Sequence, residues 1–190
     1  MTYDIILTGV GGQGVLSLAA VIAMGAMNQG LEVRQSEVHG MAQRGGSVVA
    51  HLRLSDRPIP GDLIGKASAD MVLAMEPLEG LRYTGYLKKD GILVASTAPV
   101  VNIPDYPEIE ELLSRYSALP SYRLVDAAGI AKSAGSAKTV NVVMVGAASQ
   151  FLPVEEKSLK GAIEILFKSK GDEIIATNHK AFDMGAEGVS

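Results

Sequence analysis

The stretch from Gly9 to Gly14 joins two apolar runs with no residues to spare. Ile5 to Leu7 precedes it, and the almost wholly apolar run from Val15 to Met27 follows it. A strand, a glycine turn and a helix in this order form a βα unit, whose turn presents backbone N–H groups to a phosphate. Glycines stand at the first, third and sixth positions, the spacing of such loops. The alternative is a tight turn that holds no ligand.

Apolar runs and helical patterns alternate along the rest of the chain. The run from Met71 to Met75 is continuously apolar, as in a parallel strand that is covered on both faces. The alternation predicts one α/β domain over residues 1–190, with an open, doubly wound, mainly parallel, Rossmann-like sheet. Strands are expected at residues 4–8, 31–36, 47–54, 71–75, 92–95 and 122–125. Helices are expected at residues 15–27, 126–133, 139–151 and 155–167.

Two regions are expected at the surface. The segment from Thr97 to Pro120 carries prolines and a cluster of acidic side chains, which indicates a solvated excursion with a short helix rather than an active site. His51 lies beside Arg53 on an alternating strand and is expected to be a surface or interface residue. The 3 histidines are scattered without the spacing of metal ligands, so no metal site is expected.

The composition argues against several classes of protein. Cysteine is absent, so the chain cannot form disulfides or hold an iron–sulfur cluster with its own thiolates. The net charge of −4 and the lack of polybasic runs argue against a nucleic-acid or membrane surface. No signal-peptide pattern opens the sequence, so a cytoplasmic location is expected. A chain that is 47% hydrophobic without a membrane span predicts a buried subunit interface.

A second glycine-containing segment, Ser36 to Gly46, begins at the end of the second expected strand, where open α/β sheets place ligands. Arg44 precedes Gly45 and Gly46, so a guanidinium fork stands beside exposed backbone N–H groups, an arrangement that suits phosphate or carboxylate. The alternative is a flexible crossover whose arginine forms a surface or inter-subunit salt bridge. His39 could act as a general base, but a lone histidine is more often structural.

The glycine turn lacks the sequence of a phosphate-transfer loop. Such a loop needs Lys and then Ser or Thr after its last glycine, whereas Gly14 is followed by Val15 and Leu16. Dinucleotide binding fits better, because Glu37 lies at the end of the second strand, where an acidic residue could hold a ribose.

Four segments together resemble a known family. They are Gly9–Gly14, Ser36–Gly46, Glu76–Tyr83 and the ending Asn178–Gly185. They resemble the gamma-type domain of the 2-oxoacid:ferredoxin oxidoreductases, in the form of the beta subunit of indolepyruvate ferredoxin oxidoreductase. The likeness spans the whole chain in the right order. Gamma subunits that act on pyruvate or 2-oxoglutarate tend to have a Tyr-Gly-Pro-Glu-x-Arg-Gly-Gly form in the second segment, so aryl pyruvates are the favoured substrates.

The resemblance implies a reaction in which a 2-oxoacid loses CO2, coenzyme A takes the acyl group and electrons pass through iron–sulfur clusters to ferredoxin. Thiamine diphosphate, magnesium and the clusters are then expected on a larger alpha subunit. In this sequence neither Gly61-Asp62-Leu63 nor Gly171-Asp172-Glu173 begins the Gly-Asp-Gly motif that holds thiamine diphosphate. This chain is expected to enclose the site, to contribute to coenzyme A binding, and to supply no catalytic acid or base.

The residues expected to bind a cofactor or coenzyme all lie in the two glycine segments. They are Gly9, Gly11, Gly12, Gln13, Gly14, Glu37, His39, Gln43, Arg44, Gly45 and Gly46. Three alternatives remain open from the sequence. The chain could be a gamma subunit of a pyruvate or 2-oxoglutarate:ferredoxin oxidoreductase, a free-standing dinucleotide-binding oxidoreductase, or a purely structural subunit with an empty glycine loop.

Overall fold

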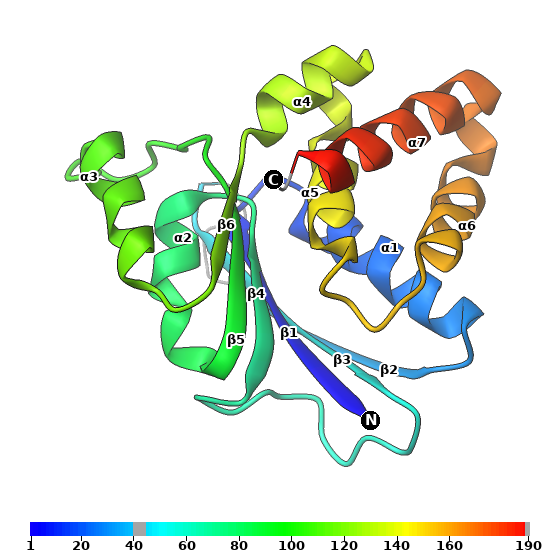
Figure 1. Cartoon of the computed structure of the whole chain (residues 1–190), viewed down its shortest axis with the longest axis horizontal. Helices are drawn as coiled ribbons and strands as arrows, with labels where there is room; N and C mark the ends of the chain where they lie inside the picture. The colour runs from blue at the N-terminus through cyan, green and yellow to red at the C-terminus, as the bar shows by residue number, and fades with distance from the viewer. Residues whose placement is uncertain (40–44, 189–190) are drawn as a thin grey trace.

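The structure is a computed structural model and describes residues 1–39 and 45–188. A six-stranded sheet in the order β2-β3-β1-β4-β5-β6 forms its centre (Figure 1). The strands are β1 (Thr2–Val10), β2 (Glu32–His39), β3 (Ser47–Ser55), β4 (Ala69–Ala74), β5 (Leu87–Ser96) and β6 (Tyr122–Val125). The helices are α1 (Val15–Asn28), α2 (Pro77–Arg82), α3 (Ile109–Ser114), α4 (Ala127–Ala134), α5 (Val140–Ser149), α6 (Glu156–Phe167) and α7 (Asp172–Glu187). Short 3-10 turns lie at Thr84–Tyr86, Arg115–Ala118, Ala137–Thr139 and Lys168–Lys170.

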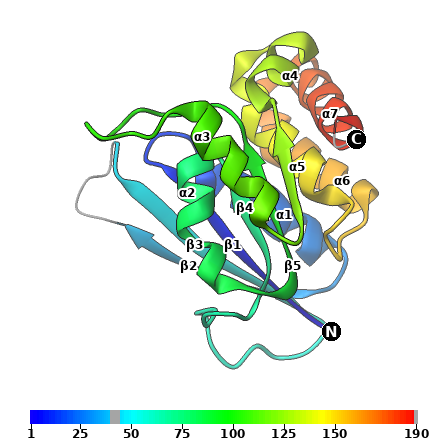
Figure 2. The same ribbon diagram turned by 60° about the vertical axis from the view of Figure 1, so that its left-hand side comes forward.

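Helices cover both faces of the sheet, as the continuously apolar central strands predict. Helices α2 and α3 lie on one side, and α1, α5, α6 and α7 lie on the other (Figure 2). Alternate side chains of β1 pack against the helices on the two faces, because successive residues of a strand point to opposite faces. Ile5 and Leu7 belong to the core beneath α1 and α5, whereas Ile6 packs with Val72 and Leu93 in the second core.

The expected α/β class and mainly parallel sheet are confirmed. Three of the five neighbouring strand pairs are parallel, namely β1 with β4, β4 with β5, and β5 with β6. The other two pairs are antiparallel and come from a β2–β3 hairpin that is added to the edge of β1. The strand that follows α1 is therefore not the neighbour of β1, as it is in a plain dinucleotide-binding unit.

Several element boundaries differ from the sequence expectation. Strand β2 continues to His39 rather than ending at Ser36, because it pairs residue by residue with β3. Helices α2 and α7 were not among the expected helices; α7 alone runs from Asp172 to Glu187 and packs along α5. Among residues 1–39 and 45–188, no helix is both long enough and apolar enough to cross a bilayer.

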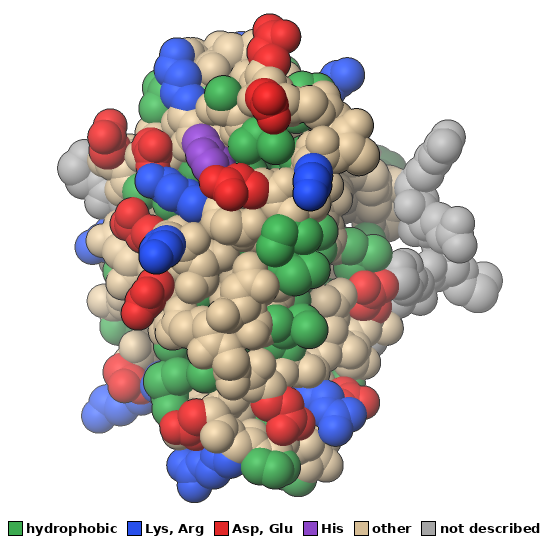
Figure 3. Space-filling model, turned by 90° about the vertical axis from the view of Figure 1, so that its right-hand side faces the viewer, with side chains coloured by type: hydrophobic (Ala, Val, Ile, Leu, Met, Phe, Trp, Pro, Cys, Tyr) green, Lys and Arg blue, Asp and Glu red, His purple; other side chains and the backbone are tan. Residues whose placement is uncertain are grey.

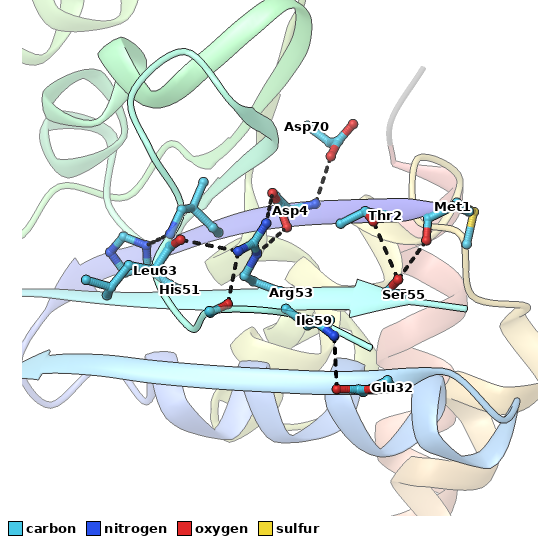
Figure 4. A network of polar contacts seen from close by, with 12 residues as sticks. Met1, Thr2, Asp4, Glu32, His51, Arg53, Ser55, Ile59, Leu63 and Asp70 are labelled. Carbon is cyan, nitrogen blue, oxygen red and sulfur yellow. Dashed lines mark hydrogen bonds and ion pairs between the residues drawn. The ribbon is translucent and has the colours of Figure 1, made fainter. Parts of the chain in front are cut away.

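Arg53 organises the end of the sheet opposite the glycine turn (Figure 4). Its guanidinium donates to both carboxylate oxygens of Asp4, at 2.9 and 3.0 Å. Its remaining nitrogen donates to the backbone carbonyls of Gly61 and Leu63, at 3.0 and 3.4 Å. One side chain thus ties β3 to β1 and to the long connection that leads into β4.

His51 is a buried residue, and its expected surface position was wrong. Its side chain is 5% exposed and lies under the same connection, where Nδ1 accepts the backbone N–H of Ile64 at 3.0 Å. Burial, assisted by the charge of Arg53, lowers the pKa of His51. The loop between β3 and β4, rather than a helix, covers this face of β3. Strand alternation alone does not predict such a cover.

We expect Arg53→Lys to lower the free energy of unfolding by about 1–3 kcal/mol, because lysine keeps the charge but loses the fork that reaches Asp4 and two carbonyls at once. Arg34 is the matched control, since it lies directly opposite Arg53 on β2 but is half exposed. Arg34→Lys should change the stability by less than about 0.5 kcal/mol. Urea unfolding of both variants measures the difference, and equal losses would contradict the role assigned to Arg53.

Candidate functional site

The turn between β1 and α1 requires glycine for two different reasons. Gly12 and Gly14 have φ angles of 103° and 77°, a left-handed backbone that favours glycine. Gly9 is fixed by packing instead, because a Cβ there would lie 3.0 Å from the Cβ of Met75 and 2.9 Å from Oε1 of Gln13. Helix α1 then begins at Val15, with the exposed backbone of Gly12 in front of it.

Gln13 holds the turn from within. Its Oε1 accepts the backbone N–H of Val10 at 2.7 Å, and its Nε2 donates to the carbonyl of Met75 at 3.0 Å. Both ends of the amide are therefore used to join the carboxyl ends of β1 and β4. Gln13 was expected to bind a ligand, and the structure gives its side chain an internal positioning role as well.

The two glycine segments lie side by side. The N–H of Gly11 donates to the carbonyl of Gly46 at 2.8 Å, and the N–H of Gly45 donates to the carbonyl of Gly11 at 3.3 Å. These bonds continue the antiparallel pairing of β1 with β3 beyond Val10 and Ser47. Gly11 and the Gly45–Gly46 pair, more than thirty residues apart in the sequence, thus form one edge, which we call the glycine edge. Gln43 and Arg44 lie outside the described residues.

Two hollows open on this edge. The first has a volume of about 340 Å³, is lined by Gly11, Gly12 and Gly14 of the turn and by the first residues of α1, and reaches Val48 of β3. The second, of about 450 Å³, lies beyond the carboxyl ends of β1, β4 and β5, and includes Ser96, Lys138 and Asn141. Open α/β sheets place ligands at these strand ends. Asn141 also donates from Nδ2 to the carbonyl of Gly14 at 3.0 Å.

Glu37 and His39 lie on β2, which β3 separates from β1. Glu37 stands opposite Ala50 and accepts a hydrogen bond from Nε2 of Gln35 at 2.7 Å, while His39 stands opposite Val48. In a dinucleotide-binding unit the acidic residue ends a strand that pairs directly with β1. Ribose binding by Glu37 therefore has less support from the structure than from the sequence, and it stays a prediction.

Two buried carboxylates follow β4, next to the glycine edge. Glu76 is 1% exposed and Glu79 is 2% exposed. Oε2 of Glu76 accepts the N–H of Glu79 at 2.8 Å, which caps α2. Oε2 of Glu79 accepts the hydroxyl of Ser47 at 2.5 Å, and Arg82 lies 3.6 Å from its other oxygen. The sequence marked this segment only through its family resemblance.

The segment after β5 returns to the same place. Its acidic residues Asp105, Glu108, Glu110 and Glu111 are exposed, as expected of a solvated excursion. Its first part is not a free loop, however, because Nδ2 of Asn102 donates to the carbonyl of Gly45 at 2.8 Å and the hydroxyl of Tyr106 donates to Oε1 of Glu76. Residues 97–106 therefore form one wall of the candidate site.

Comparison with known proteins identifies the family. The pyruvate ferredoxin/flavodoxin oxidoreductase family matches residues 4–188. The chain belongs to this family. Indolepyruvate oxidoreductase subunit IorB of Pyrococcus horikoshii is 36% identical over 97% of this chain and 95% of its own length. The same-named subunit of Archaeoglobus fulgidus is 38% identical over 97% of this chain and 94% of its own length.

Solved structures show the fold of this oxidoreductase family in two settings. The gamma subunit of a keto/oxoacid ferredoxin oxidoreductase from Geobacter sulfurreducens is 26% identical, with a TM-score of 0.73 over 100% of this chain and 97% of that chain. A 2-oxoglutarate:ferredoxin oxidoreductase from Magnetococcus marinus has a TM-score of 0.78 at 23% identity, over 99% of this chain but 31% of that chain. The fold occurs both as a separate subunit and within a longer polypeptide.

The family resemblance read from the sequence is thus confirmed, while the individual site residues stay predictions. Sequence reasoning missed Ser96, Lys138 and Asn141, which come together only when the strand ends converge. Their positions carry a weak signal, since Ser96 ends β5 and Lys138 and Asn141 flank the start of α5, as ligand-binding residues of α/β sheets do.

Glu79 makes the stability of this oxidoreductase subunit depend on pH. Burial raises the pKa of Glu79 above its ordinary value of 4.5, and the charge of Glu76 adds to this, against the opposing effects of Ser47 and Arg82. A carboxyl group with a raised folded pKa contributes stability below its unfolded pKa and loses it as pH rises through the folded pKa.

We therefore expect the wild type to lose stability relative to Glu79→Gln as pH is raised from about 4 to about 7, because the glutamine cannot ionise. Urea unfolding at several pH values measures the difference between the two proteins. Parallel stability curves would show that the pKa of Glu79 is not raised in the folded protein.

Proposed function

We propose that the chain is the beta subunit of an indolepyruvate (aryl pyruvate):ferredoxin oxidoreductase. The observation that carries this proposal is an identity of 36–38% with IorB subunits along nearly the full length of both proteins. Identity falls to 28% for the common gamma subunit of the pyruvate and ketoisovalerate oxidoreductases of Thermococcus kodakarensis. In the proposed reaction a 2-oxoacid and coenzyme A yield acyl-CoA and CO2, and two electrons reduce ferredoxin.

The residues of this chain do not fit the redox groups of that reaction. It has no cysteine to hold an iron–sulfur cluster. Neither of its two Gly-Asp pairs, Gly61-Asp62 and Gly171-Asp172, begins the Gly-Asp-Gly motif that holds thiamine diphosphate through a metal ion. We therefore assign these groups to a larger alpha subunit, and assign to this chain the binding of coenzyme A and the enclosure of the site.

The glycine edge suits the phosphates of coenzyme A. Gly12 offers an exposed backbone in front of α1, where the helix dipole favours an anion. Lys138, which is exposed beside the second hollow, adds a positive charge. Arg44 directly precedes Gly45 in the sequence, and we propose that it donates to the same phosphates.

Several large hydrophobic side chains are exposed on the surface and could be buried in a subunit interface. Val101 is 72% exposed, Leu63 63%, Met27 59% and Ile165 53%. Figure 3 shows the face of the molecule on the side of α6 and α7, where hydrophobic side chains lie in patches between charged ones. A specific contact with the alpha subunit should bury more than about 1,000 Å² in total.

We expect the chain alone to be colourless and inactive, and to become part of an active enzyme only when it is combined with its alpha subunit. Ferredoxin reduction should then be fastest with aryl pyruvates in a panel that includes pyruvate and 2-oxoglutarate. Ferredoxin-dependent oxidation by the lone chain, or a preference for 2-oxoglutarate in the complex, would contradict the proposal.

Arg44→Ala should weaken the apparent affinity for coenzyme A by roughly ten- to a hundredfold, because a charge-assisted bond to phosphate contributes about 1.5–3 kcal/mol. The KM for the 2-oxoacid should change much less. Lysine should restore the affinity only in part, since it lacks the guanidinium fork.

Arg34→Ala is the matched control for this measurement, because Arg34 is half exposed on β2 and its ion pairs are with Glu32 and Asp62. If Arg44 only braces the partner, the Arg44→Ala complex should dissociate on dilution while its coenzyme A kinetics stay normal. Unchanged kinetics in a stable complex would remove Arg44 from the site.

A further inference from the structure

Glu76 joins two segments that no strand connects. Its Oε2 caps α2 through the N–H of Glu79, at 2.8 Å. Its Oε1 accepts the hydroxyl of Tyr106 and the backbone N–H of Val100, the latter at 3.4 Å. Both partners on this second oxygen belong to residues 97–106, which we call the arm. A carboxylate that is 1% exposed thus anchors the arm to the end of β4.

The contacts of the arm form a closed ring. From Glu76 the ring passes through the N–H of Glu79 to the carboxylate of Glu79, and from there to the hydroxyl of Ser47 at 2.5 Å. Ser47 directly follows Gly45 and Gly46 in the sequence. Asn102 returns to the arm, since its Nδ2 donates to the carbonyl of Gly45 at 2.8 Å.

The ring is also connected to the glycine turn through backbone hydrogen bonds. The backbone of Gly45 and Gly46, which the ring holds from one side, is paired with Gly11 on the other side, at 2.8 and 3.3 Å. A displacement of the arm would therefore be passed to Gly11 through two hydrogen bonds. Gly11 lines the hollow in front of α1.

Beyond Thr97, secondary structure and apolar packing give the arm little support. Residues 97–106 contain no helix or strand, and Val101 in their midst is 72% exposed, so that little apolar burial holds them in place. Thr97 holds the start of the arm, since its N–H donates to the carbonyl of Val125 at 2.9 Å. The polar contacts with Glu76 and Gly45 fix the residues that follow. Hydrogen bonds to a buried carboxylate are stronger than those between neutral groups, and losing one leaves the charge poorly compensated.

We propose that Glu76 and Tyr106 are positioning residues, which hold the arm against Gly45 and Gly46 and so preorganise the glycine edge for its anionic ligand. The identity of that ligand as coenzyme A rests on the proposed function; the positioning itself does not. Preorganisation increases affinity because the cost of ordering the site is met before the ligand binds.

Tyr106→Phe tests the proposal, since it removes one hydroxyl and keeps the ring. Amide hydrogen exchange in residues 97–106 and at Gly45 should speed up by about tenfold or more, as expected when a bond to a charged group is lost. The affinity of the full chain for coenzyme A should fall by roughly three- to tenfold by the same reasoning. The melting temperature should change by no more than about 4 °C, because the core is untouched.

Asn102→Ala cuts the ring at its other end and should give the same pattern. The double variant should exchange little faster than either single variant, because residues of one network do not act additively. Glu110→Gln is the control, since it alters an exposed side chain of the same excursion that lies outside residues 97–106 and outside the ring. It should leave both exchange and affinity unchanged.

The outcomes separate this proposal from the proposed function. Faster exchange with a wild type that does not bind coenzyme A would contradict the function and leave the positioning of the arm supported. Faster exchange with an unchanged coenzyme A affinity would overturn the positioning role. Unchanged exchange in both Tyr106→Phe and Asn102→Ala would show that the ring does not hold the arm, and would also overturn it.

Discussion

The backbone pairing of Gly11 with Gly45 and Gly46 is the interaction on which the site depends. It extends the β1–β3 ladder past its last side-chain pair, and it places two glycine segments on one edge. A hairpin inserted beside β1 is the cause, since without β3 the second segment would not return to the first. Strand pairing therefore builds the site as much as it builds the sheet.

The polar side chains around this edge form hydrogen bonds mainly with the backbone. The amide oxygen and the amide nitrogen of Gln13 both form hydrogen bonds that hold the turn, and Asn141 donates to the carbonyl of Gly14. Glu76 and Glu79 are buried and hydrogen-bonded, as carboxylates must be when they leave water. The arrangement suits the proposed role of a subunit that binds and encloses a ligand.

The sequence predicted local features better than neighbour relations. Strand β6 was expected at its observed bounds, and α1 within one residue, because apolar periodicity and the glycine stop are local signals. The neighbour of β1 could not be predicted in this way, since pairing order depends on contacts between distant residues. Helix α7 was missed because few of its residues are buried, which weakens the apolar pattern.

For the candidate site, too, the sequence predicted local motifs but not contacts between distant residues. Both glycine segments were recognised from spacing and family resemblance, whereas the roles of Ser96, Lys138 and Tyr106 required the folded chain. His51 was misplaced because strand alternation shows which face a residue takes but not what covers that face. Buried polar residues are the hardest to assign from sequence, since their partners come from other elements.

Titration of the glycine-15N-labelled chain with coenzyme A, followed by NMR, tests the central claim most directly. If the two segments form one ligand site, the amide signals of Gly11, Gly12, Gly14 and Gly45 should shift together along a single binding curve. Those of Gly85 and Gly161, which lie away from this edge, should stay in place. Shifts confined to one segment, or no shifts at millimolar coenzyme A, would contradict the account.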